Sequence, residues 1–315
     1  MNSKFSRTVK ALCVSAAIAM LSACGGSTST VDPFTPTRVI GLGDGYNDVG
    51  SSANAPYTVR GTGTVSTVVE QVAVYFWGVV TSGTFATDAT YAQGQLPATG
   101  LYSYAVGNSL IKSGADSLET QIARLKDDIG GNNLTPKDLI VITAGTQDIK
   151  ATYTTAGAEA AADALVAQVK ELMVMGAKRI LILQPMELAL TPYARDAANS
   201  ANYPIAPNTS PTVKFNAKAA GDLHSYIVTL KLTTNPVIYG AYNLSSYFNS
   251  YANTTSTVLF ANSYQPYCGN VNSFSGCAGA TDGNYLFADG INLTPAGNRW
   301  VAQYLYSSAL ISAWR

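Results

Sequence analysis

The fold of this chain is decided by the stretch Val39-Ile40-Gly41-Leu42-Gly43-Asp44-Gly45-Tyr46-Asn47-Asp48-Val49-Gly50. Its first part is a continuous apolar run, typical of a strand that is buried on both faces of a parallel sheet. Its second part is rich in glycine and aspartate, and this composition indicates a turn. Ligands of such sheets bind beyond the carboxyl ends of the strands, so we expect this turn to lie at a site.

Apolar runs alternate with segments of helical period along the rest of the chain. Strands are predicted at residues 38–42, 138–143, 179–183 and 236–239. Helices are predicted at residues 66–77, 118–129, 158–175, 213–230 and 294–314. Continuous apolar strands between helices indicate an α/β protein whose central sheet is mostly parallel and covered on both faces.

Four short blocks, in the right order and at the right spacing, resemble those of the SGNH (GDSL) hydrolase family. They are Gly43-Asp44-Gly45-Tyr46, Tyr104-Ala105-Val106-Gly107-Asn108-Ser109, Gly145-Thr146-Gln147-Asp148 and Asp289-Gly290-Ile291-Asn292. The last is followed by Leu293-Thr294-Pro295, which also resembles the family. The resemblance implies a three-layer α/β/α fold of the flavodoxin-like type, formed by residues 38–315 as a single domain.

The resemblance also implies a catalytic arrangement, and this chain departs from it. In the family a serine attacks an ester carbonyl, a histidine takes its proton and an aspartate orients the histidine. The matching positions here are Gly45, Asn292 and Asp289. Glycine has no nucleophile, and an asparagine amide cannot accept a proton near neutral pH. The oxyanion-hole positions are Gly107 and Gln147, the latter standing where the family has asparagine.

Other residues are weaker candidates. Asp44, Tyr46 and Asp148 accompany the site and are predicted to contribute to ligand binding. Ser51 and Ser52 could replace the missing nucleophile, but they lie six and seven residues beyond Gly45, so this role is disfavoured. Some tyrosines could line a sugar- or acyl-binding cleft, although ordinary packing is favoured for most of them: Tyr46, Tyr57, Tyr91, Tyr102 and Tyr104.

The cysteines and the histidine argue against a metal or another cofactor. Cys268 and Cys277 lie close together in a Gly/Asn/Ser-rich loop of an exported chain, which favours a disulfide. A metal site is the alternative, but no histidine or further cysteine is near in sequence. His224 is the only histidine, and it is interpreted as a helix-surface or packed residue. We expect no metal and no cofactor.

The first residues are predicted to be a lipoprotein signal peptide, residues 1–23. A basic start precedes a short apolar run, and Leu21-Ser22-Ala23-Cys24 matches a bacterial lipobox. Cys24 would then carry the lipid that anchors the protein in a membrane, and residues 24–37 would form a flexible tether. Gly25 after the cysteine favours the outer membrane of the cell envelope. The alternative is a signal peptide that is cut elsewhere.

The balance of charged residues limits the classes of partner that the sequence suggests. Removing residues 1–23 takes away three of the 19 basic residues and no acid, which leaves 16 basic against 19 acidic groups. This balance gives no indication of nucleic acid as a partner. The favoured hypothesis is a non-catalytic lipoprotein whose cleft binds a glycan, lipid or ester-type ligand. The alternatives are an active ester hydrolase with a rearranged site and an envelope scaffold with a vestigial cleft.

Overall fold

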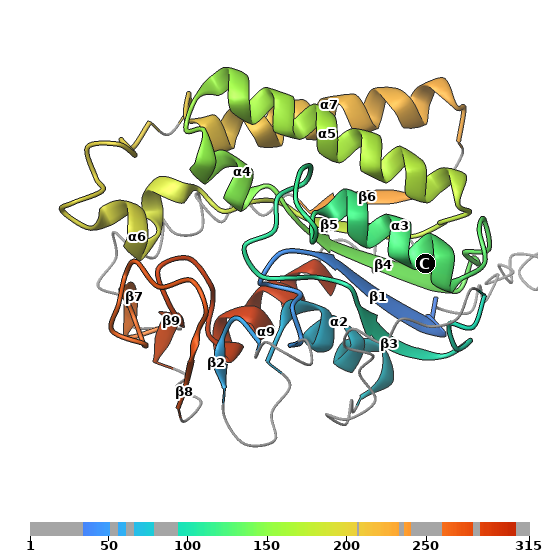
Figure 1. The fold of residues 1–315 in the computed structure, drawn as a ribbon, viewed down its shortest axis with the longest axis horizontal. Helices are drawn as coiled ribbons and strands as arrows, with labels where there is room; N and C mark the ends of the chain where they lie inside the picture. The colour runs from blue at the N-terminus through green and yellow to red at the C-terminus, as the bar shows by residue number, and fades with distance from the viewer. Residues whose placement is uncertain are drawn as a thin grey trace, which may run out of the picture. The chain divides into compact units, whose positions relative to one another are not determined.

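The computed structural model describes residues 34–50, 56–60, 66–78, 94–206, 208–232, 236–240, 260–279 and 284–306. All of them belong to the compact unit Phe34–Trp314. Its centre is a five-stranded parallel sheet (Figure 1). In spatial order the strands are β3 (Gly100–Ser103), β1 (Arg38–Gly43), β4 (Asp138–Thr143), β5 (Ile180–Leu183) and β6 (Val237–Gly240).

Alternating strand residues build one core on each face of the sheet. Ile40, Ile140 and Ile180 point into a core shared with α3 (Leu118–Asp128), α5 (Thr155–Val174) and α7 (Pro211–Thr229). Their neighbours Val39 and Leu139 point into a second core, shared with α2 (Val68–Trp77) and α9 (Pro295–Tyr304). Figure 1 shows these two helical layers on either side of the sheet. The predicted three-layer α/β/α fold is therefore confirmed.

The strand order places a topological switch point between β1 and β4. Taken in chain order, the strands follow the 2-1-3-4-5 arrangement of flavodoxin-like sheets, in which ligands bind where the order reverses. β1 and β4 pair from Arg38 with Asp138 to Gly43 with Thr143, so the two strands start and end level. The turns that follow them therefore begin side by side.

The parallel sheet has two ends, a site edge and an entry edge. The site edge comprises the segments after the strands, residues 44–50, 104–117, 144–154 and 184–191. The entry edge comprises the segments before the strands, residues 34–37, 94–99, 129–137, 175–179 and 230–232.

Helix boundaries follow capping residues. α5 begins three residues before the predicted start because the Thr154 side chain accepts the N–H of Gly157. α7 begins two residues early, since Ser210 caps it and Pro211 occupies its first turn. At α2, Thr67 and Glu70 form a reciprocal capping box.

Shorter elements were not predicted, and most of them surround the site edge. They are α4 (Thr146–Ala151), η1 (Leu188–Leu190), α6 (Pro192–Arg195), β2 (Val59–Arg60), β7 (Asn262–Pro266), β8 (Cys277–Ala278) and β9 (Tyr285–Phe287). β2 pairs with β8, and β7 pairs with β9. The predicted disulfide between Cys268 and Cys277 is present, with an S–S distance of 2.09 Å. In the segments that the structure describes, no helix is long and apolar enough to cross a membrane.

Candidate functional site

The turn after β1 is held tightly against β4. Gly43 has a φ of 109°, and a Cβ there would collide with the carbonyl oxygen of Thr143, so glycine is required. The N–H of Asp44 donates to that same carbonyl at 2.7 Å. The amide of Gln121 donates to the Gly43 carbonyl at 2.9 Å and accepts the Gly43 N–H at 2.6 Å. These bonds fix where Gly45 lies.

Gly45 faces the side chain of Asn292, which comes from the loop between β9 and α9. A Cβ on Gly45 would lie 2.6 Å from Asn292 Oδ1 and 2.9 Å from the Cβ of Tyr57. Both distances are shorter than a normal van der Waals contact. The two positions predicted for nucleophile and base therefore lie together, and the space beside Gly45 is already filled.

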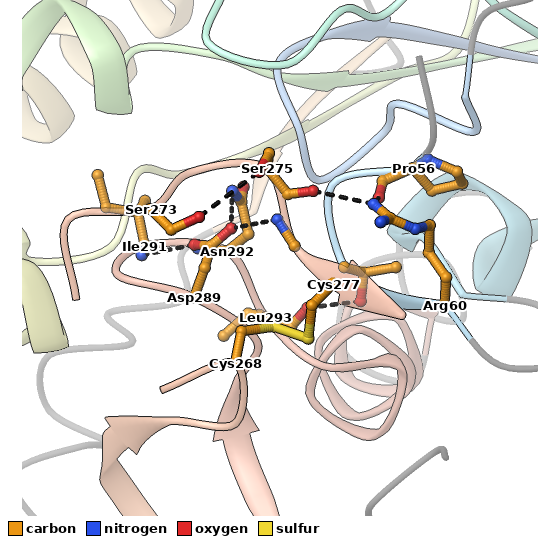
Figure 2. Close-up of a disulfide and its surroundings, with 12 residues drawn as sticks. Pro56, Arg60, Cys268, Ser273, Ser275, Cys277, Asp289, Ile291, Asn292 and Leu293 are labelled. Atoms are coloured by element: carbon orange, nitrogen blue, oxygen red, sulfur yellow. Dashed lines mark hydrogen bonds between the residues drawn. A yellow bond between two sulfur atoms is a disulfide. The ribbon is translucent and has the colours of Figure 1, made fainter. Parts of the chain in front are cut away.

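The Asn292 side chain is oriented by Asp289, which is fully buried. One Asp289 oxygen accepts the main-chain N–H groups of Ile291 at 2.9 Å and Asn292 at 2.7 Å. The other accepts the Asn292 Nδ2 at 2.9 Å and the N–H of Gly276 at 2.8 Å, as Figure 2 shows beside the disulfide. Burial raises the pKa of Asp289, and these donors oppose the rise. The amide nitrogen is thus committed to Asp289, and the amide oxygen faces Gly45.

Tyr57 lies between Gly45, the predicted nucleophile position, and Gly107, a predicted oxyanion-hole position. Its Cβ is against Gly45, and a Cβ on Gly107 would collide with its ring. Its hydroxyl hydrogen-bonds the Asn108 side chain, and burial together with the charges of Asp48 and Asp289 raises its pKa. The aromatic ring therefore covers Gly107.

A short strap, residues 56–60, holds Tyr57 in this place. The Thr58 hydroxyl donates to the Leu293 carbonyl at 2.7 Å, and the Thr58 carbonyl accepts the N–H of Cys277 at 3.1 Å. Arg60 donates to the Ser275 carbonyl at 3.1 Å (Figure 2). Because Cys277 is tied to Cys268, the strap is pinned to a cross-linked loop.

The main-chain N–H of Gly107 is engaged by a carboxylate of the same turn. It donates to Asp48 Oδ2 at 2.7 Å, and the N–H of Gly50 donates to Asp48 Oδ1 at 2.8 Å. Asp48 is buried. The predicted oxyanion-hole donor of Gly107 is thus directed at a negative charge of the protein itself.

Gln147, the other predicted oxyanion-hole position, is buried at the start of α4. Its Oε1 accepts from the Lys150 ammonium at 3.4 Å. Lys150 lies over the Phe274 ring, 3.9 Å from its centroid, and 5.4 Å from that of Tyr193. Burial lowers the pKa of Lys150, and the charge of Asp289 opposes this. A cation in an aromatic setting therefore accompanies the site.

Asp44 and Asp148 follow β1 and β4 at the switch point. Burial raises the pKa of Asp44 to about 7, with Thr143 and the Tyr46 N–H opposing and Asp148 adding to the rise. Burial also raises the pKa of Asp148 to about 6, although both of its oxygens accept the N–H of Ile111 at 3.2 Å. Perturbed carboxyl groups at a strand end are characteristic of functional sites.

The remaining predicted positions are spread more widely. Tyr46 is buried in the core beneath the turn, and its hydroxyl donates to the Ile291 carbonyl at 2.9 Å, so it joins the first and last blocks. His224 is exposed on α7. Ser51, Ser52 and Cys24 lie outside the described residues. Within the described segments, no three potential ligands are grouped so that they could hold a metal ion.

Lys150 was not singled out from the sequence, and Tyr57 was named only among the tyrosines that could line a cleft. Lys150 carried no signal beyond its position five residues after Gly145, one helical turn into α4. Tyr57 was one of many tyrosines, and its role depends on pairing with a loop some 220 residues away, as between Val59 and Cys277. The Asp48 contact follows from neither motif alone, because it joins the first block to the second.

Comparison with known proteins finds similarity to one family over most of the chain. The model of the GDSL-like lipase/acylhydrolase family matches residues 42–305. Among solved structures, a member of the lipolytic G-D-S-L family from Veillonella parvula is 12% identical, covering 86% of this chain and 97% of its own, with a TM-score of 0.43. A protein assigned as a GDSL-like lipase from Parabacteroides merdae is 13% identical, covering 88% and 97%, with a TM-score of 0.49. No curated protein matches the chain.

Proposed function

The chain belongs to the GDSL-like lipase/acylhydrolase family, and from that premise we propose that it is a non-catalytic member which binds its ligand without cleaving it. The observation that carries the proposal is that the reaction centre is filled by the chain's own groups. Where the family places nucleophile, base and oxyanion, this chain has a glycine, an amide and a donor directed at a carboxylate.

The nucleophile position offers neither a hydroxyl nor room for one. A serine at Gly45 would bring its Cβ within 2.6 Å of Asn292 Oδ1. The base position offers no proton acceptor of suitable pKa, because an amide is not basic near neutral pH. Asp289 orients this amide as it would a histidine in the family's mechanism, so an orienting group remains without a base to orient.

The predicted oxyanion position at Gly107 is covered by the Tyr57 ring and lies beside the negative charge of Asp48. An oxyanion hole needs preorganised donors aimed at the developing negative charge. The Gly107 N–H is aimed at Asp48, whose carboxylate would repel an oxyanion, and the Tyr57 ring lies over Gly107. An ester carbonyl could reach this donor only if both groups moved.

The rim of the centre supports binding of a glycan, lipid or ester-type ligand. Lys150, Gln147 and the rings of Phe274 and Tyr193 combine a cation, an amide and apolar faces in one place. Such groups recognise the hydroxyls and apolar faces of sugars or acyl chains. We further propose that the protein is an outer-membrane lipoprotein, attached through Cys24, so that this ligand is met in the cell envelope.

The test of lost catalysis is hydrolysis of short p-nitrophenyl esters by the purified lipoprotein in detergent. The wild-type rate should equal that of Asp289→Ala and of the milder variant Asn292→Ala, each checked for folding by circular dichroism. Turnover that exceeds both variants would contradict the proposal, since it would require a working group in this centre.

A reconstruction tests whether the filled centre is the cause. Gly45→Ser alone should give no activity and should lower stability, because of the close approach to Asn292. Gly45→Ser with Asn292→His, Tyr57→Ala and Asp48→Ala, which also frees the Gly107 N–H, should gain measurable esterase activity. The matched control replaces the serine by alanine in the same background and should stay inactive.

Binding is tested by calorimetry with soluble peptidoglycan fragments and short acylated oligosaccharides. Affinity for the ligand that binds should fall at least tenfold in Lys150→Met and in Gln147→Ala, the loss expected when a buried polar contact is removed. Lys112→Met, which changes an exposed lysine of the site edge, serves as the control. Equal affinity in all variants would place the ligand elsewhere.

A further inference from the structure

The described chain enters the domain at the edge of the sheet opposite the site. The Phe34 ring packs against Phe76, with centroids 5.9 Å apart, and lies 4.2 Å from the Arg179 guanidinium. The Trp77 indole donates to the Pro36 carbonyl at 3.0 Å, and the N–H of Thr37 donates to the Lys137 carbonyl at 2.9 Å. These contacts fix the end of the tether at the entry edge.

The entry edge is basic. Its loops, in the residues that the structure describes, contain four basic residues and no acidic one: Lys137, Lys178, Arg179 and Lys231. The adjoining helix ends add three acidic residues: Asp127 and the buried Asp128 on α3, and Glu171 on α5, which is paired with Lys126 at 2.7 Å. The site edge, by contrast, has an excess of acidic residues: it holds two basic residues, Lys112 and Lys150, and five acidic ones, Asp44, Asp48, Asp116, Asp148 and Glu187. The charge of the domain is therefore divided between its two edges.

Apolar side chains are exposed beside these basic residues. Val174 ends α5 and is 61% exposed, Val228 near the end of α7 is 59% exposed, and Leu230 and Leu232 follow at 45% and 41%. α5 and α7 both lead into strands of the parallel sheet, β5 and β6, so their last turns lie together at the entry edge (Figure 1). Large exposed apolar side chains gathered in this way mark an interaction surface.

Lys231 occupies a strained backbone position in this surface. It has a φ of 52° just after α7, where its N–H donates to the Val228 carbonyl at 2.9 Å. A residue that follows a helix in this left-handed conformation is usually glycine. A lysine here sacrifices some stability for a charge at the entry edge, as is common where a residue serves an interaction.

From these observations we propose that the entry edge docks on the surface of an anionic phospholipid bilayer. The basic side chains contact the headgroups, and Val174, Val228 and Leu230 enter the interface. The inference rests on the proposed lipid at Cys24. From Cys24 to Phe34 the chain spans ten residue steps, so Phe34 at the entry edge can lie at most about 35 Å from the bilayer.

This orientation directs the site away from the membrane. β1 and β4 each have six residues, so the two edges lie roughly 20 Å apart. The site edge, with its acidic residues, would then face the aqueous space, where a soluble ligand can reach it. Repulsion between the exposed Asp116 carboxylate of this edge and anionic headgroups would disfavour the reverse orientation.

The experiment measures acylation of lysines by a membrane-impermeant reagent in the lipoprotein reconstituted into phosphatidylglycerol-rich vesicles. Mass spectrometry compares Lys137, Lys178 and Lys231 with exposed Lys112 of the site edge. The three entry-edge lysines should react at least about fivefold more slowly than in detergent, because contact with the headgroups shields their side-chain amines from the reagent. Lys112 should be unchanged, and pure phosphatidylcholine or high salt should reduce the protection.

The matched variants are Val228→Asp with Leu230→Asp at the entry edge, and Ile205→Asp elsewhere. Ile205 is 60% exposed, as much as Val228, but it lies between α6 and α7, after β5 on the site side. The double variant should lose the protection, and Ile205→Asp should keep it. Equal labelling of Lys112 and the three lysines, or loss of protection only in Ile205→Asp, would overturn the docking surface.

Failure of the lipoprotein to float with vesicles would remove the anchor and with it this inference. Ester hydrolysis in the separate assay above would instead overturn the non-catalytic function and leave the docking surface intact. The two proposals can therefore fail independently.

Discussion

The strand pair β1 and β4 has carboxyl groups at both ends: the one at the start is ion-paired, and those at the end have raised pKa values. At its start, Arg38 donates two hydrogen bonds of 2.6 Å to Asp138, its direct partner in the register. At its end, Asp44 and Asp148 share the switch point, and their pKa values are raised by burial. The first arrangement stabilises the fold. The second costs stability, which is characteristic of sites kept for function.

Breaking the ion pair should have the largest effect. Asp138→Ala leaves the Arg38 guanidinium buried without its partner and orphans the Thr135 N–H, which donates to Asp138 at 2.6 Å. Loss of one member of a buried pair costs about 3–5 kcal/mol of unfolding free energy. Urea denaturation followed by tryptophan fluorescence measures it. Arg38→Met with Asp138→Leu should cost much less, because no charge remains buried; an equal loss would mean that the ion pair is not the cause.

The carboxyl groups at the other end of the β1–β4 pair should make the unfolding free energy depend on pH. The pKa of Asp44 rises from its ordinary 3.8 to about 7 on folding, so the folded chain binds more protons than the unfolded chain between these values. The unfolding free energy must then fall as the pH rises from about 4 to 7, by on the order of 3 kcal/mol. Asp44→Asn should flatten that slope and be more stable than wild type at pH 8. Asp148 adds to the slope in the same direction.

Asp116→Asn, a half-exposed carboxylate of the site edge, is the control for this measurement. It should leave the slope as in wild type. A stability profile in which Asp44→Asn and wild type remain parallel from pH 4 to 7 would show that Asp44 is ionised throughout, and the contrast between the two ends would lose its electrostatic part.

The sequence predicted the fold because its signals are local. Continuous apolar strands at β1, β4, β5 and β6 and the helical period of α3 and α7 needed no knowledge of distant contacts. β3 was missed, since Gly-Leu-Tyr-Ser is neither continuously apolar nor long. Of the helix predicted to Trp314, α9 covers Pro295–Tyr304, and residues 307–314 lie outside the described residues.

Only the site residues that belong to the family-like sequence blocks could be predicted. Family resemblance singled out Gly45, Asn292 and Asp289 in the blocks, and in the structure these residues lie beside one another. Nothing local indicated that Tyr57 would cover Gly107, because its place is set by a strap that pairs with a distant loop. The space beside Gly45 and Gly107 is filled by packing between segments that are far apart in the sequence, so only the structure could reveal it.

The disulfide-linked loop gives a third test, which concerns the strap that holds Tyr57 over the site. Replacing Cys268 and Cys277 by serine opens a loop with a sequence separation of 9, which should cost about 2.5–3 kcal/mol in the chain-entropy model. Tyr57 should then become more exposed, which hydrogen exchange of the strap would detect. Wild type in reducing agent is the matched comparison; unchanged exchange in both would show that the strap does not depend on the disulfide.

The smallest effect is expected at the entry edge, where Lys231→Gly should raise stability. Glycine adopts the left-handed conformation without strain, so the gain should be about 0.5–1 kcal/mol. Lys231→Ala removes the same charge but keeps a Cβ in that conformation, so it should show no gain. On the docking proposal both variants should bind phosphatidylglycerol vesicles less well, although only one is more stable. A stabilised Lys231→Gly with undiminished binding would show that the strain at this residue is not kept for the membrane.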